Sequence, residues 1–144
     1  MQMDDLYQEM IIDHYKHPRH AATLTDEEVL VDEENPTCGD RIRLTATVAE
    51  DGTVSDIRYD ANGCAISVAS ASMMAETLVG RPVGEAREQI RDFVELMRGR
   101  KEIDPSELGD LVALEGVKNF PMRIKCATMC WHAVEHALNQ LATA

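Results

Sequence analysis

The sequence is poor in basic residues, and this scarcity limits the partners it can bind. Its 144 residues contain 14 Lys and Arg against 26 Asp and Glu, which gives a formal net charge of −12. Nucleic-acid binding requires enough cations to neutralise several phosphates. We therefore expect no nucleic-acid partner, and a basic partner surface fits the charge better.

Long apolar runs are also missing. The opening Met1–Asp5 lacks the basic region and apolar stretch of a secretory signal, and no later segment approaches the length of a membrane span. We therefore expect a cytoplasmic protein without a membrane partner. In a reducing cytosol, its four cysteines are expected to be free, catalytic or metal-bound rather than paired in disulfides.

Close C-x-x-C pairs, internal repeats, low-complexity tracts and linkers are absent as well. Structural zinc sites usually use such close cysteine pairs, so their absence disfavours a purely structural zinc. A chain of this length buries about two-thirds of its unfolded surface without help from a metal. We predict a single domain over residues 1–144.

Alternating apolar and polar residues predict strands in the first half of the chain. Residues 42–48 follow this period of two, and Asp51-Gly52 is a strong hairpin turn. The partner strand over residues 54–59 has a slipped alternation, which predicts a bulge. A short strand at residues 29–31 precedes this hairpin.

Apolar residues spaced three and four apart predict helices on either side of these strands. The expected helices cover residues 4–17, 65–79, 86–97 and 108–114, with a last one from about residue 121. Strands come first and most helices later, without βαβ alternation. The predicted class is α+β, with a small antiparallel sheet of about three strands covered by helices.

Three cysteines fall at boundaries of these elements, namely Cys38, Cys64 and Cys126. Sulfur donors combined with one oxygen donor suit zinc, and thiolates also carry sulfur or hold iron–sulfur clusters. Asp40 lies two residues after Cys38 in an extended segment, so the two side chains would point the same way. Ordinary buried cysteines are the alternative, but three boundary cysteines beside glycine or charge favour a thiolate site.

Cys130 follows Cys126 by four residues, which is about one helical turn. It could therefore compete with Asp40 as a fourth ligand. Its position on the apolar stripe of the last helix favours a buried thiol instead. The sequence leaves this choice open.

The histidines form two groups. His14, His17 and His20 lie at the end of the first predicted helix, where cations complement the helix dipole. His132 and His136 form an i, i+4 pair on the last helix, without the carboxylate of an H-E-x-x-H motif between them. We interpret this pair as part of a solvated face.

Three motifs together resemble the IscU/NifU-like superfamily of iron–sulfur assembly proteins. They are Asn35–Asp40 (NPTCGD), Gly63–Ser67 (GCAIS) and Arg123–Ala127 (RIKCA), and they occur in the family's order. The resemblance covers essentially the whole chain. Within the superfamily the chain looks like the SufU branch, because Lys125 stands where scaffold members carry a His and the stretch between the second and third cysteines is long.

The resemblance implies a fold, a metal and a function. It implies an IscU/SufU-like fold with zinc bound by the side chains of Cys38, Asp40, Cys64 and Cys126. It further implies a zinc-dependent sulfurtransferase that accepts persulfide sulfur from a pyridoxal-phosphate cysteine desulfurase of the SufS type. The sulfur would pass to downstream iron–sulfur assembly proteins. In the exchange thought to operate in the family, a partner His displaces one cysteine from zinc, and the motif makes this catalytic cysteine Cys38.

Two other functions are compatible with the same residues. The same ligands could hold iron in a scaffold that assembles and transfers a [2Fe–2S] cluster, or zinc could support an adaptor that only binds the desulfurase. Arg123 and Lys125, beside Cys126, are candidates for contacting a persulfide or steering the partner, although surface solubility explains them equally well. A monomer is expected, because no separate apolar stripe is left for a self-interface.

Overall fold

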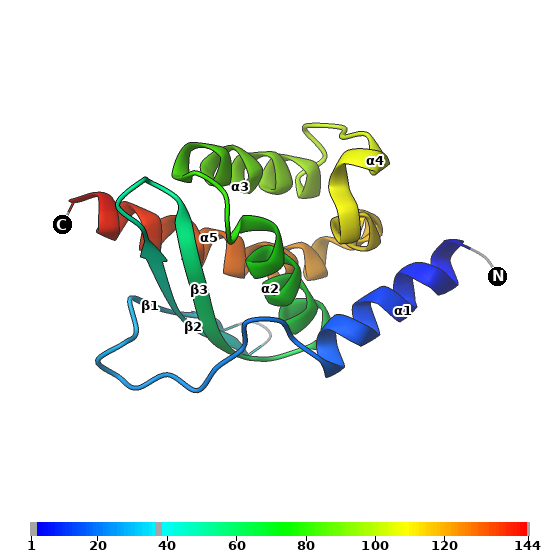
Figure 1. Cartoon of the computed structure of the whole chain (residues 1–144). Helices are drawn as coiled ribbons and strands as arrows, with labels where there is room; N and C mark the ends of the chain where they lie inside the picture. Colours follow the sequence, from blue (N-terminus) through cyan, green and yellow to red (C-terminus); the bar gives the residue numbers. More distant parts are fainter. Residues whose placement is uncertain (1–2, 37–38, 144) are drawn as a thin grey trace.

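The computed structural model describes residues 3–36 and 39–143 (Figure 1). Along the chain the elements are α1 (Met3–Lys16), β1 (Val31–Asn35), β2 (Asp40–Val48), β3 (Val54–Asn62), α2 (Ala65–Leu78), α3 (Val83–Met97), α4 (Pro105–Leu108), the 3₁₀ helix η1 (Gly109–Asn119) and α5 (Pro121–Thr143). None of the helices in these ranges is long and apolar enough to cross a membrane.

The sheet is antiparallel throughout, with the strand order β1-β2-β3. Thr47 pairs with Asp56 but Val48 pairs with Val54, so Ser55 is an extra residue on β3. This irregularity is the bulge that the slipped alternation predicted. It allows Val54 and Ile57, three residues apart, to be buried together.

The first strand lies later in the chain than predicted. Residues 29–31 were expected to form it, whereas β1 covers Val31–Asn35. Acidic residues are usually rare in strands. Here, however, β1 pairs antiparallel with β2, which places Asp32 opposite Arg43 and Glu34 opposite Arg41. Arg41 binds Asp32 through both Nε and Nη2, at 2.9 and 2.6 Å. This cross-strand pairing provides partners for an acidic edge strand.

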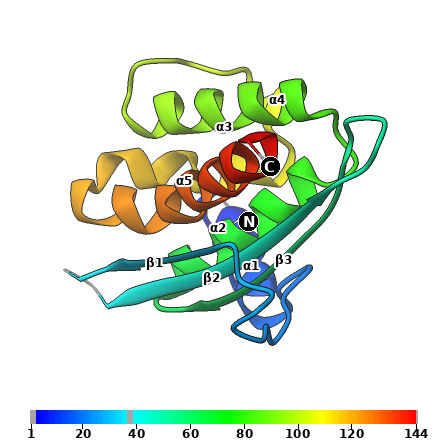
Figure 2. The ribbon, with the colours of Figure 1, turned by 90° about the vertical axis from the view of Figure 1, so that its left-hand side faces the viewer.

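Helices cover one face of the sheet in successive layers (Figure 2). α5 packs on β1 and β2, α2 packs on β3, and α3 packs on α5. α1 packs along α2 (Figure 1). The core between these layers includes Trp131 of α5 stacked on Phe93 of α3, with ring centroids 4.3 Å apart. The α+β prediction, with three antiparallel strands covered by helices, is confirmed.

The segment predicted as a helix over residues 108–114 is divided in two. Asp104 accepts a hydrogen bond from the Ser106 N–H at the start of α4, and Gly109, with φ of +57°, ends it. In η1, the buried residues Leu111, Leu114 and Val117 recur every three residues. That spacing matches the three residues per turn of a 3₁₀ helix better than the 3.6 of an α-helix.

Candidate metal centre

Three side chains from distant segments meet at one end of the sheet. Asp40 begins β2, Cys64 is the N-cap residue of α2, and Cys126 lies in the second turn of α5. One potential ligand atom from each lies within 4.8 Å of the others. Asp40 and Cys126 are each only 1% exposed, while Cys64 is partly exposed. Cys38, predicted to join them, lies outside the described residues.

Asp40 can occupy this position only because residue 63 is glycine. Gly63 has φ of +155°, and a Cβ atom there would overlap Oδ1 and Cγ of Asp40. The Cys64 N–H, at the start of α2, donates to Asp40 Oδ1 at 3.0 Å, and the Ser67 hydroxyl donates to Oδ2. Both contacts fix the orientation of the carboxylate at a helix N-terminus, where negative charge is favoured.

The spacing of these donors suits a four-coordinate metal. Cys64 Sγ lies 3.9 Å from Asp40 Oδ2. Ordinary zinc–sulfur and zinc–oxygen bond lengths at a tetrahedral angle give about 3.6 Å for this separation. Two thiols and a carboxylate also form the mixed sulfur and oxygen set that zinc accepts, and iron binds the same atoms. The residues present therefore fit a zinc ion, with one position left for a further ligand.

Hydrogen bonding favours the thiolate form of Cys64. Burial raises the pKa of this thiol, but its hydrogen bonds with the side chain and backbone of Ser67 and with Cys126 outweigh burial and leave the pKa below its ordinary value. The nearby Asp40 charge opposes this shift. A thiolate is the form that binds metals and attacks sulfur. Ser67 closes the Gly63–Ser67 motif and lies three residues after the N-cap cysteine, but these sequence features did not predict that its side chain would bind Asp40.

Cys130 points to a different environment from Cys126. Its Sγ lies 3.5 Å from Ser70 Oγ, which also accepts the Trp131 Nε1–H at 3.1 Å. Ser70 in turn donates to the Ala127 carbonyl at 2.6 Å. Burial raises the pKa of Cys130 to about 12. The described structure thus groups Asp40, and not Cys130, with Cys64 and Cys126, and Cys130 is a buried thiol.

The two cations beside Cys126 lie on different surfaces. Both are exposed, but Arg123 lines a groove of about 710 Å³ that includes Cys64. Lys125 lines another cavity, of about 430 Å³, together with Glu33 and Glu34. Only Arg123 therefore faces the approach to Cys64. The last helix, α5, begins at Pro121 as predicted, so Cys126 lies five residues inside it rather than at the helix start that was also expected for this cysteine.

The histidines lie in different environments. His136 is exposed and contacts Glu33, as expected for a solvated face. His14, in contrast, is 1% exposed, and its ring binds partners from two other helices. The sequence pattern placed His14 among cations at a helix end and gave no sign of this burial.

Comparisons with known proteins identify the family of this chain. The family model described as the NifU-like N-terminal domain matches residues 6–127. The zinc-dependent sulfurtransferase SufU of Bacillus subtilis (strain 168) is 47% identical over 133 residues, covering 92% of this chain and 89% of that protein. The iron–sulfur cluster assembly scaffold protein IscU of Streptococcus pyogenes serotype M1 is 40% identical, covering 99% of this chain and 88% of that protein.

A solved structure shows the same fold. It is a proposed iron–sulfur cluster assembly scaffold protein for the SUF system from Fervidobacterium islandicum AW-1, with 32% identity and a TM-score of 0.79. The match covers 95% of this chain and 99% of that chain. The family expected from the three cysteine motifs is confirmed, and the chain belongs to the NifU-like N-terminal domain family.

Proposed function

We propose that this protein is a zinc-dependent sulfurtransferase that accepts persulfide sulfur from a cysteine desulfurase and relays it to iron–sulfur cluster assembly. The observation that carries the proposal is the largely buried group of Asp40, Cys64 and Cys126, whose donor spacing fits zinc. The B. subtilis relative named as such an enzyme supports it. Cys38, two residues before Asp40, supplies the fourth ligand and the acceptor thiol, an assignment that rests on the sequence motif.

Bound zinc would hold its cysteine ligands as thiolates at neutral pH, without redox chemistry of its own. In the transfer, the Cys38 thiolate attacks the outer sulfur of the persulfide on the desulfurase cysteine. The sulfur–sulfur bond there breaks, its electron pair stays on the desulfurase cysteine as a thiolate, and Cys38 becomes the persulfide. Asp40 is held in place by Ser67 and the Cys64 N–H, and Arg123 attracts the anionic sulfur.

A [2Fe–2S] scaffold is the second candidate, because the same sulfur and oxygen donors bind iron. The scaffold protein of S. pyogenes, at 40% identity, favours it. Lys125 argues against it, since the scaffold pattern has a histidine at this position. We therefore place the sulfurtransferase first.

The deciding experiment measures turnover of a pyridoxal-phosphate cysteine desulfurase of the SufS type, with cysteine as substrate, in the presence of the zinc-loaded protein. We expect a large stimulation that is lost in Cys38→Ala. Cys130→Ala is the matched control, because it removes a buried thiol outside the site and should keep the stimulation. Full stimulation by a folded, zinc-loaded Cys38→Ala variant would refute the assignment of Cys38.

A second assay separates the scaffold and adaptor alternatives. Anaerobic reconstitution with iron and sulfide should give no stable cluster that transfers to an apo-protein. A stable, transferable cluster without desulfurase stimulation would favour the scaffold. Tight desulfurase binding with neither activity would favour an adaptor in which zinc only supports the fold.

We also propose that the protein acts as a cytoplasmic monomer that hands sulfur to downstream assembly proteins. Its net charge of −12 supports solubility and opposes self-association. Light scattering after size-exclusion chromatography should give the mass of one chain, 16.0 kDa. A stable dimer mass would contradict the monomer.

A further inference from the structure

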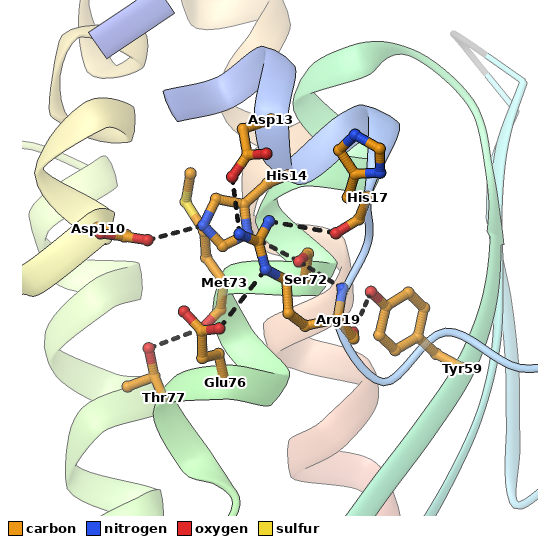
Figure 3. Close-up of polar contacts among 10 residues, drawn as sticks. All are labelled: Asp13, His14, His17, Arg19, Tyr59, Ser72, Met73, Glu76, Thr77 and Asp110. Carbon is orange, nitrogen blue, oxygen red and sulfur yellow. Dashed lines mark hydrogen bonds and ion pairs between the residues drawn. The ribbon is translucent and has the colours of Figure 1, made fainter. Parts of the chain in front are cut away.

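A buried histidine joins three helices on the side of α2 that faces α1 (Figure 3). His14, near the end of α1, places Nδ1 2.7 Å from Ser72 Oγ on α2 and Nε2 2.8 Å from Asp110 Oδ2 on η1. His14 and Ser72 are almost fully buried. We refer to Ser72, His14 and Asp110 as the His14 bridge.

The proton positions in the His14 bridge follow from its partners. Nε2 faces a carboxylate oxygen, so Nε2 carries a hydrogen and donates it to Asp110. Ser72 Oγ already accepts the Arg19 backbone N–H at 2.9 Å, which leaves its hydroxyl hydrogen able to point at Nδ1. Both ring nitrogens are therefore engaged, and the orientation of the ring is fixed from both sides.

The acidic side chains around the His14 bridge already have a cation of their own. Arg19 lies beside Asp13 and Glu76, with Nη2 2.7 Å from Asp13 Oδ2 and Nε 3.7 Å from Glu76 Oε2 (Figure 3). His14, Glu76 and Asp110 have the spacing of potential metal ligands. A metal ion, however, would have to compete with this guanidinium and break the bond between His14 and Asp110. We therefore interpret the group as an internal tie between helices.

Two of the helices joined by the His14 bridge, α1 and η1, form opposite walls of the groove that contains Cys64. α1 contributes Ile11 to one wall, Cys64 lies at the start of α2, and residues from Ala113 to Phe120 form the other wall, with Arg123 following on α5. Ile11 precedes His14 by about one turn, and Ala113 follows Asp110 by three residues. The His14 bridge therefore connects the two walls just past the end of the groove that Ile11 and Ala113 line.

The exposed apolar side chains around this groove suit a protein partner. Phe120 lines the groove and is 63% exposed, and Met122, two residues later, is 84% exposed. Exposed apolar patches of this kind mark interaction sites, and the groove is continuous with Cys64 and Arg123 of the candidate metal centre.

We propose that the His14 bridge sets the separation of α1 and η1, and thereby the fit of the desulfurase segment that carries the persulfide into this groove. This inference rests on the proposed sulfurtransferase function. His14 and Asp110 are positioning residues, because they act through the groove walls and contact neither the transferred sulfur nor a metal ligand. Their loss should weaken docking of the desulfurase without changing the transfer step.

The test is steady-state desulfurase turnover with varied concentrations of the zinc-loaded protein and its variants. In His14→Ala and Asp110→Ala, the KM for this protein should rise about tenfold while kcat stays within about twofold, since one buried hydrogen-bonded tie is lost. The double variant should be no worse than either single variant, because both remove the same tie. His14→Gln, which keeps a donor toward Asp110, should recover most of the loss.

His17→Ala is the matched control, because His17 lies on the segment after α1 and its exposed ring points away from the His14 bridge (Figure 3). Its KM should equal that of the wild type. Asp110 is 48% exposed, so Asp110→Ala keeps the test available even if His14→Ala does not fold. Unchanged KM in Asp110→Ala, or additive effects in the double variant, would overturn the proposal.

Two further measurements separate the possible failures. The cobalt-substituted protein should show the same thiolate charge-transfer bands in His14→Ala as in the wild type; altered bands would overturn a role confined to the groove. If the wild type stimulates no desulfurase, the proposed function fails, and amide hydrogen exchange still tests the His14 bridge. Residues 109–119 should then exchange faster in His14→Ala than in His17→Ala, and equal exchange would overturn the inference.

Discussion

Two groups of potential metal ligands occur among the described residues, and only one has the properties of a metal site. Asp40, Cys64 and Cys126 form the first, and His14, Glu76 and Asp110 form the second. Each brings its ligand atoms within 4.8 Å of one another. The first offers soft sulfur donors in a largely buried place, whereas the two carboxylates of the second are exposed.

The two groups differ more in the partners of their carboxylates than in the spacing of their ligand atoms. Asp40 is oriented by neutral donors, the Ser67 hydroxyl and the Cys64 N–H. Asp110 accepts the His14 Nε2–H, and Glu76 lies beside the Arg19 guanidinium, so both carboxylates of the second group already have partners. Close spacing of ligand-type residues is therefore insufficient evidence for a metal. The partners that the carboxylates already have decide which group is suited to a metal ion.

The largest expected effect comes from removing a thiol of the first group. Cys126→Ser should lower zinc affinity by about 100-fold or more, because it replaces a thiolate ligand with a poor one. Competition with a chromophoric chelator measures this affinity. His14→Ala is the matched control from the second group and should still bind one zinc with unchanged affinity. Loss of a second equivalent of zinc in His14→Ala would contradict the distinction between the two groups.

Gly63→Ala breaks the first group without changing any ligand. The added Cβ would overlap the Asp40 carboxylate at a backbone φ of +155°, so Asp40 must move away from the thiols. We expect weaker zinc binding and a loss of stability of about 1–3 kcal/mol. Gly52→Ala is a matched control, because its φ is +85° with nothing within 4 Å of the added atom. It should lose stability through backbone strain but keep its zinc affinity, and equal zinc affinities in the two variants would refute the steric argument.

The sequence predicted the first of these groups but not the second. The cysteine motifs, the bulge and the helix stripes depend on local spacing, and local spacing predicted them. His14 was missed because its partners lie 58 and 96 residues away along the chain. The position of β1 was missed for the same reason, since its acidic residues depend on Arg41 and Arg43 of the neighbouring strand. Non-local polar pairing leaves no periodic signal.

Cys126 and Cys130 allow a metal-ligand candidate and a core thiol to be compared within one helix, α5. Both are almost fully buried, yet Cys126 lies with Cys64 and Asp40 while Cys130 lies beside Ser70 and Trp131. Burial alone therefore does not separate a ligand from a core thiol. In metal-free protein at neutral pH, we expect a thiol reagent to modify Cys64 and to leave Cys130 unmodified until the protein unfolds.

The effect expected only at alkaline pH is a loss of stability from Cys130. Its pKa is raised by burial from an ordinary 9.0 to about 12, so the unfolded chain releases this proton first as pH rises. The stability is fully present below pH 9 and declines by up to about 1.4 kcal/mol per pH unit between pH 9 and 12. Urea unfolding of metal-free protein at pH 8 to 11 should show a shallower decline in Cys130→Ala than in the wild type. Parallel declines would mean that Cys130 is not held as a neutral thiol by its surroundings, and the distinction from Cys126 would then depend on position alone.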